Sequence, residues 1–166
     1  MKFCEIVEKV KSDSSTSPRG AFTLFVKLND KWGIKLFWCE EDRDAAYENQ
    51  KLFASYGVGP EVGGKVDLPQ GEQPYGYITE VVELLYIPYN SSMTYEEMEQ
   101  RAKLKQELLA QYGTWDDDED CDMPIQTRMR ELEEITGVEL YDMHLANWGF
   151  KNGELIPIDF GFYCEN

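Results

Sequence analysis

The sequence predicts an α+β protein, in which an N-terminal antiparallel sheet with one helix precedes a mainly helical C-terminal half that ends in a β-hairpin. Segments of the first half are rich in β-branched and aromatic residues and are separated by turn residues, as strands are. Two segments of the second half repeat apolar residues at helical spacing. Between two short apolar segments near the end, Asn152-Gly153 is a strong hairpin signal.

The composition fits a small folded protein. Its 166 residues suit one compact domain made of two small lobes, which we place at residues 1–88 and 89–166. The chain is 42% hydrophobic and 13% aromatic, which is enough to fill a core and unlike a disordered chain.

The expected elements of the first half are mostly strands. Residues 2–10 alternate between charged and apolar side chains, which predicts a strand, and a Ser-rich loop follows up to Gly20. Residues 21–28 and 31–38 should form a hairpin across the turn at Asn29-Asp30. A helix is expected over residues 42–56, closed by Gly57, and further strands over residues 64–68 and 75–85.

Two helices and the hairpin make up the expected second half. Thr94 and Glu97 have the spacing of a capping box, which predicts a helix over residues 94–112. Asp122 is suited to begin the next helix, and Gly137 is suited to end it. The hairpin strands are expected at residues 147–150 and 155–158.

Charge and hydropathy exclude several classes of function. The net charge is −16, so direct nucleic-acid binding is not expected, whereas a partner with a basic surface is compatible with the charge. No apolar run approaches the ~20 residues of a membrane span, and the N-terminus does not resemble a signal peptide. The four cysteines are far apart in the sequence, so reduced thiols and a cytoplasmic location are expected.

Three polar residues near the end of the chain form a candidate site. Asp142 and Asn147 are five positions apart, and Asp159 follows twelve positions later. A tight hairpin brings the beginning of its first strand beside the end of its second, so Asn147 and Asp159 should be neighbours. A carboxylate and a carboxamide oxygen are suitable ligands for Mg²⁺. Asp142 would stand clear of the metal and could accept a proton from a hydroxyl group.

These residues resemble the catalytic loop and the metal-binding motif of the protein-kinase-like superfamily. Asp142-Met-His-Leu-Ala-Asn147 followed by Asp159-Phe-Gly is similar to D-x-x-x-x-N and D-F-G, and the His variant is similar to aminoglycoside phosphotransferases and related atypical small kinases. The expected order of elements also resembles the kinase order over nearly the whole chain. Only the segment from Asp142 onward is specific.

The resemblance implies further site residues upstream. Lys35 would be the strand lysine that contacts the phosphates of ATP, and Glu48 would be its ion-pair partner. Glu80 and Val82 lie in a segment that resembles the hinge strand, whose backbone would bind adenine. The loop before the second strand offers Ser15, Thr16 and Gly20 to the phosphates.

Glu48 also has support from the helical pattern. It lies three residues after Ala45 and four before Leu52, on the apolar stripe that should face the core. A carboxylate that faces a core requires a partner, which Lys35 would supply. Asp44 shares that face one turn earlier, so it is an alternative partner.

The function that the resemblance implies is an ATP- and Mg²⁺-dependent phosphotransferase. Asp142 would be the base, and the acceptor would be a hydroxyl group of a protein or a small molecule. Two alternatives remain, because the chain has no G-x-G-x-x-G and only five residues follow Gly161, so the resemblance does not extend to an activation segment. One is a nucleotide-binding pseudokinase that acts as a protein-interaction or inhibitory module. The other is an acidic decoy of a nucleic-acid-binding protein.

Overall fold

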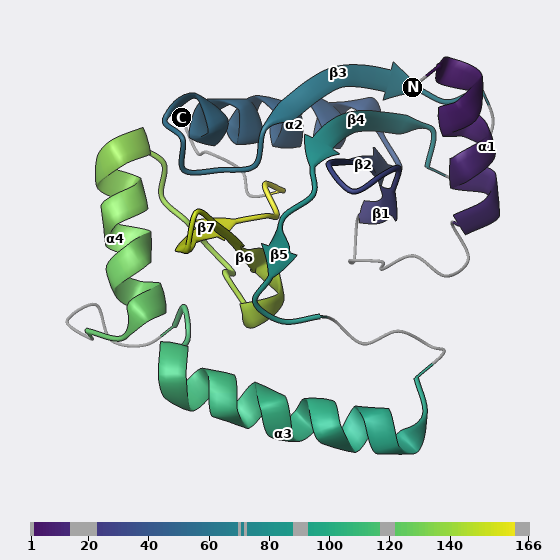
Figure 1. Cartoon of the computed structure of the whole chain (residues 1–166). Coiled ribbons are helices and arrows are strands. Elements are labelled where there is room, and N and C mark those ends of the chain that lie inside the picture. The colour runs from purple at the N-terminus through teal and green to yellow at the C-terminus, as the bar shows by residue number, and fades with distance from the viewer. Residues whose placement is uncertain are drawn as a thin grey trace.

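The computed structural model describes residues 2–13, 23–69, 71, 73–87, 93–116 and 122–161 (Figure 1). It is an α+β protein with a four-stranded antiparallel sheet, helices and a small three-stranded sheet. The helices are α1 (Phe3–Asp13), α2 (Glu40–Ser55), α3 (Tyr95–Tyr112) and α4 (Pro124–Thr136), with a 3₁₀ turn η1 at Leu145–Asn147. The strands are β1 (Thr23–Lys27), β2 (Trp32–Phe37), β3 (Val62–Asp67), β4 (Tyr75–Glu80), β5 (Glu83–Leu84), β6 (Trp148–Lys151) and β7 (Glu154–Pro157).

The larger sheet has the strand order β1-β2-β4-β3, and all its neighbours are antiparallel. The predicted hairpin of β1 and β2 is confirmed. In its register Lys35 of β2 lies between Phe25 of β1 and Tyr77 of β4. Lys35 is therefore on a central strand rather than at the edge of the sheet.

Each face of this sheet carries a hydrophobic cluster. Because side chains alternate along a strand, Ile34 and Leu36 of β2 join one cluster and Phe37 joins the other. The first cluster is closed by Ile6 and Val10 of α1. The second is closed by α2, α4 and the C-terminal hairpin, so both halves of the chain contribute to one core. Lys35 lies on the same face of β2 as Phe37.

The prediction of a strand at residues 2–10 is wrong, because this segment is helix α1. The alternation of charged and apolar residues coincides with a helical pattern in which Phe3, Ile6, Val7 and Val10 recur at intervals of three and four. Ile6 and Val10 are buried against the sheet, and the face opposite to them is exposed.

The other predicted helices are confirmed, with small shifts at their ends. Helix α2 begins two residues before the expected Asp42, and Gly57 follows it with a φ of 74°. The predicted capping box of α3 is present between Thr94 and Glu97. Helix α4 has Met123 as its N-cap instead of Asp122, and Pro124 is its first residue.

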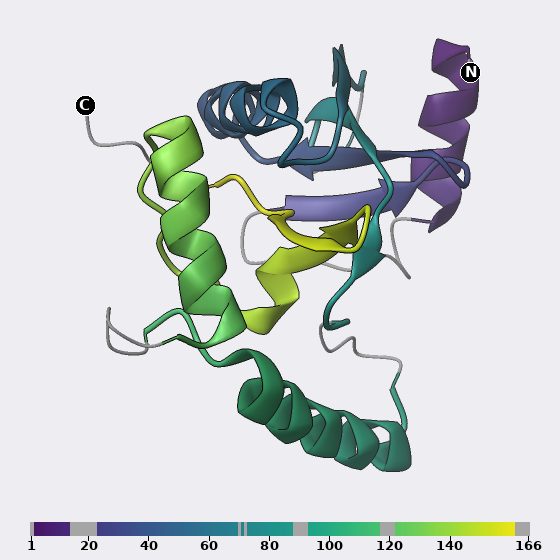
Figure 2. The same ribbon diagram turned by 60° about the vertical axis from the view of Figure 1, so that its left-hand side comes forward.

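Helix α3 lies on the outside of the molecule, along the edge remote from the larger sheet (Figures 1 and 2). None of its residues is buried. Its C-terminal turns pack Leu108, Leu109 and Tyr112 against the main core as half-buried side chains.

The predicted strand over residues 75–85 is divided between the two sheets. It leaves the larger sheet after Glu80, and β5 pairs with β6 of the hairpin. Gly149 permits this pairing, because a Cβ atom there would lie 2.8 Å from the Glu83 carbonyl oxygen. The connection between β4 and β5 is therefore the link between the sheet and the hairpin. In the part of the chain that the structure describes, no helix is long and apolar enough to cross a membrane.

Candidate functional site

The C-terminal hairpin brings Asn147 next to the Asp159 segment. Asn152 and Gly153 form its turn with φ values of 54° and 82°, the left-handed pair that a type I′ turn requires. Beyond the last strand pair, the Ile158 amide donates to the Asn147 carbonyl at 2.9 Å. Asn147 therefore faces the residue immediately before Asp159.

The loop before the hairpin holds Asp142 in a left-handed conformation. Asp142 has a φ of 55°, which Asp tolerates better than most residues. Its carbonyl oxygen accepts hydrogen bonds from the His144 amide and from the Asn147 side-chain nitrogen, both at 2.9 Å. Because that nitrogen is engaged, the carboxamide oxygen of Asn147 is the atom that remains for a cation.

The Asp142 carboxylate is exposed and, among the described residues, contacts one side chain. Its oxygen lies 2.9 Å from Nε2 of His144, and both side chains are more than half exposed. His144 is a loop histidine, as its lack of a metal-ligating companion in the sequence suggests, and its ring also meets Trp115 edge-on. An acceptor molecule could therefore approach the carboxylate from solvent.

Lys35 reaches the Asp159 segment from the larger sheet. Its ammonium donates to the Ile158 carbonyl oxygen and, at 3.4 Å, to the Gln50 side-chain oxygen. It also lies 5.3 Å from the ring centroid of Phe160. Burial lowers the pKa of Lys35 to about 8, and the Asp159 carboxylate opposes that shift. The lysine and the Asp-Phe-Gly segment thus form one site.

The expectation that Glu48 pairs with Lys35 is wrong. Glu48 is exposed, and its carboxylate lies 3.8 Å from Lys51 on the same helix. The buried residues of α2 are Arg43, Ala46, Gln50 and Phe53, so the inward stripe is one position away from the expected one. Side chains two positions apart on a helix point in directions that differ by about 200°. Glu48 therefore points outward when Gln50 faces the lysine.

The alternative, Asp44, does not contact Lys35 either. Its carboxylate binds Arg43 and lies 3.0 Å from Lys65. Hydrogen bonding to Lys65 lowers the pKa of Asp44 against the opposing effect of burial, and the bond from Arg43 lowers it further. This acid therefore belongs to the ion pairs at the beginning of α2.

Phe160 fixes the Asp-Phe-Gly segment to α2. Its side chain is fully buried and packs edge-on against Phe53, with ring centroids 5.4 Å apart. Its carbonyl accepts a hydrogen bond from the Asn49 side chain at 3.3 Å, and the Gly161 amide donates to the Asp159 carboxylate at 3.2 Å. Sequence reasoning missed Asn49 and Gln50, although their spacing to Phe53 was a signal of an inward face.

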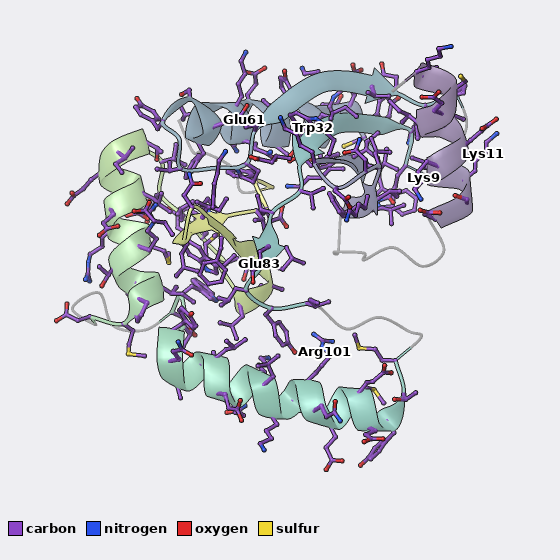
Figure 3. The ribbon with its side chains drawn as sticks, in the orientation of Figure 1. Lys9, Lys11, Trp32, Glu61, Glu83 and Arg101 are labelled. Carbon is purple, nitrogen blue, oxygen red and sulfur yellow. The ribbon has the colours of Figure 1, made fainter. Side chains whose placement is uncertain are left out.

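The expected hinge is the connection from β4 to β5. The Glu80 amide donates to the Glu61 carbonyl and the Val81 amide to the Lys31 carbonyl, both at 2.8 Å, so neither is open to a ligand. Val82 is half-buried and would lie 3.0 Å from a Cβ atom at Gly149. Figure 3 marks Glu61, next to this connection, and Glu83, just after it.

The Glu80 side chain has a structural partner. Its carboxylate accepts hydrogen bonds from Lys151 at 2.8 Å and from the Glu61 amide at 3.0 Å. Burial favours the neutral acid, but these bonds outweigh it and lower the pKa of Glu80. Lys151 ties the hairpin to the end of β4, so the side chain and the amide of Glu80 are both engaged, and its carbonyl oxygen is the group that could meet a nucleotide.

The donors for a divalent cation are few. Within the described ranges, no group of three or more His, Cys, Asp or Glu side chains could hold a metal ion. Asp159 and the carboxamide oxygen of Asn147 are oxygen donors, which is the chemistry that Mg²⁺ selects when phosphates and water complete its shell. Ser15, Thr16 and Gly20 lie outside the described residues.

Comparison with known proteins identifies no relative of this chain. The chain matches no protein-family model, no curated protein and no solved structure.

Proposed function

We propose that this protein binds Mg·ATP and transfers its γ-phosphoryl group to a hydroxyl acceptor, as a minimal protein-kinase-like phosphotransferase. The observation that carries the proposal is the contact of Lys35 with the Ile158–Asp159 segment. A cation from the sheet and a carboxylate from the hairpin thereby meet beside Asn147. From β1 onward, the order of elements also agrees with the order that the resemblance implies.

The chain supplies a distinct group for each task. Lys35 would bind phosphate oxygens after it leaves the Ile158 carbonyl. Asp159 and Asn147 would hold Mg²⁺, which when bound neutralises charge on the phosphates. The acceptor oxygen would form its bond to the γ-phosphorus while the bond to the ADP oxygen breaks, and its proton would pass to the Asp142 carboxylate. The main chain of the Glu80–Val82 segment would bind the adenine through groups other than the Glu80 and Val81 amides, which the Glu61 and Lys31 carbonyls engage.

A second candidate is a nucleotide-binding module without catalysis, acting on a protein partner. The observation that favours it is the neutral partner of Lys35. Helix α2 presents Gln50 where the resemblance implies a carboxylate, and the lysine is engaged by the Ile158 carbonyl. The net charge of −16 suits a partner with a basic surface.

Calorimetry with Mg·ATP and an assay of ATP turnover, with water or added hydroxyl compounds as acceptors, test the proposal. We expect binding by the wild type and turnover that falls at least ~100-fold in Asp142→Asn, with ATP affinity nearly unchanged. Glu139→Gln is the matched control, because Glu139 is exposed and three residues upstream of Asp142.

The possible outcomes distinguish the two candidates and test the role of Asp142. Absence of Mg·ATP binding to the wild type would contradict both. Binding without turnover would support the second candidate. Turnover that Asp142→Asn leaves intact would show that Asp142 is not the base.

A further inference from the structure

We propose that Gln50 is a positioning residue, which holds the Lys35 ammonium against the Ile158–Asp159 segment as an uncharged partner. The inference deepens the proposed function, since it concerns the lysine that would bind the phosphates. Gln50 is fully buried in the middle of α2.

The Gln50 side chain joins α2 to two strands and a loop. Its nitrogen donates to Thr79 Oγ1 at 2.6 Å and to the carbonyl oxygens of Pro60 and Glu61 at 3.1 and 3.4 Å. Its oxygen accepts from the Tyr77 hydroxyl at 2.9 Å and faces Lys35 Nζ at 3.4 Å. All the polar capacity of one buried amide is therefore used.

These partners determine which way the amide points. Carbonyl oxygens only accept hydrogen bonds, so the side-chain nitrogen must face Pro60 and Glu61. An ammonium only donates, so the oxygen must face Lys35. A flipped amide would place its oxygen against the Pro60 and Glu61 carbonyl oxygens and its nitrogen against the Lys35 ammonium. The oxygen that faces the lysine is thus fixed by the protein.

A carboxylate could not replace this amide without loss. Glutamate at position 50 has no hydrogen to give to the Pro60 and Glu61 carbonyls, and its charge would be buried. It would, however, pair with Lys35. A neutral partner therefore leaves the lysine more weakly held in its charged form than an ion pair would.

The charged groups around Lys35 are few. Asp159 approaches from the hairpin and favours the charged lysine, whereas burial disfavours it, and the pKa of Lys35 falls to about 8. On the β4 side lies Tyr77, whose pKa burial raises well above its ordinary value, an effect that Asp159 increases. Tyr77 therefore stays protonated and keeps donating to Gln50.

An NMR titration of the Lys35 side chain in the whole protein tests the inference. Its signal is assigned by its loss in Lys35→Arg. In the wild type we expect a midpoint near pH 8. In Gln50→Glu the midpoint should rise by at least about one pH unit, because an opposite charge within hydrogen-bonding distance stabilises the ammonium.

The matched control is Gln126→Glu. Gln126 of α4 is also buried, and its nitrogen donates to the carbonyls of Thr114 and Trp115 at 3.4 and 2.6 Å, so this change imposes the same loss of donors far from Lys35. It should lower the melting temperature and leave the Lys35 midpoint unchanged. If the role of Gln50 were purely structural, Gln50→Glu would likewise lower the melting temperature and leave the Lys35 midpoint unchanged.

A Lys35 midpoint that Gln50→Glu leaves unchanged would overturn the inference. If Gln50→Glu does not fold, proton exchange in the wild type decides. The side-chain amide protons of Gln50 should then exchange at least ~100-fold more slowly than those of exposed Asn152, and equal rates would contradict the inference.

The titration requires no nucleotide, so its failure and that of the proposed function are distinguishable. A shifted midpoint in a protein that does not bind Mg·ATP would support the positioning role and contradict phosphotransfer. An unshifted midpoint in a protein that turns over ATP would contradict the positioning role and support phosphotransfer.

Discussion

The Lys35 ammonium donates a hydrogen bond to the main-chain carbonyl of Ile158, 123 positions further along the chain. This bond joins the central strand of the larger sheet to the end of the hairpin. A lysine on a strand and an Asp-Phe-Gly turn are each common in proteins. Their contact, with Asp159 as the carboxylate nearby, is what makes them parts of one candidate site.

The contact predicts how stability depends on pH. The pKa of Lys35 is about 8 in the folded protein, below its ordinary value of 10.5. Between these values the unfolded chain binds more protons, so the contribution of Lys35 to the free energy of unfolding should rise with pH. The full change is at most about 3.5 kcal/mol, because each pKa unit corresponds to about 1.4 kcal/mol.

Denaturant unfolding of the wild type and Lys35→Met between pH 7 and pH 11 measures this contribution. Groups other than Lys35 titrate in both proteins, so the difference between them isolates the lysine. The wild type should gain stability relative to the variant from about pH 8 upward. A difference that does not change with pH would contradict the low pKa.

Phe160 and Gly161 of the Asp-Phe-Gly segment should differ in how much they contribute to stability. Phe160→Ala should reduce the free energy of unfolding by about 3–5 kcal/mol, because it removes a fully buried ring from the core. Gly161→Ala should change it by less than about 1 kcal/mol, since among the described residues a Cβ atom there meets the Asp159 carboxylate alone, at 3.5 Å. Equal losses in the two variants would show that the backbone at Gly161 is constrained.

Asp159 should make nucleotide binding depend on the metal. We expect the wild type to bind ATP at least ~10-fold more tightly with Mg²⁺ than with a chelator, and Asp159→Asn to bind with nearly the same affinity under both conditions. Calorimetry gives both affinities. The control is Asp122→Asn, a fully exposed position. A metal effect of equal size in Asp159→Asn would assign the cation to other ligands.

Local signals in the sequence predicted most of the fold. The Thr94–Glu97 capping box, the left-handed Gly137 after α4 and the Asn152–Gly153 turn are confirmed because each depends on the chemistry of a few adjacent residues. The same turn explains why the Asn147–Asp159 neighbourhood was predictable.

The predictions that were wrong concern features that depend on contacts between residues far apart in the sequence. The rotation of α2 about its axis is set by the packing of Phe53 and Gln50 against the sheet, so that Gln50, two residues after Glu48, faces the lysine. The division of the strand after Glu80 depends on Lys151, which is far along the chain. The spacing of Gln50 to Phe53 is a local signal for the first of these features, whereas the Lys151 contact has no signal in the sequence around Glu80.

The prediction of a strand at residues 2–10 was wrong for another reason. The pattern of apolar residues in this segment fits both the strand period and the helix period, and mutations can distinguish the two structures. In a strand Ile6 and Glu8 would share one face, whereas in the helix only Ile6 is buried. Ile6→Ala should cost about 2–4 kcal/mol and Glu8→Ala less than about 0.5 kcal/mol in the free energy of unfolding. Thermal or denaturant unfolding measures both, and similar costs would argue for the strand.

Helix α3 indicates where the protein could be modified without loss of its site. None of its residues is buried, its first turn is held by its own cap, and Arg101 stacks 4.6 Å over the ring of Tyr86. The groups around Lys35 come from β2, β4, α2 and the hairpin, so none depends on the first half of α3. Its exposed side chains are therefore suitable positions for a fluorescent label or an affinity handle, with which the proposed binding of Mg·ATP could be tested in the intact molecule.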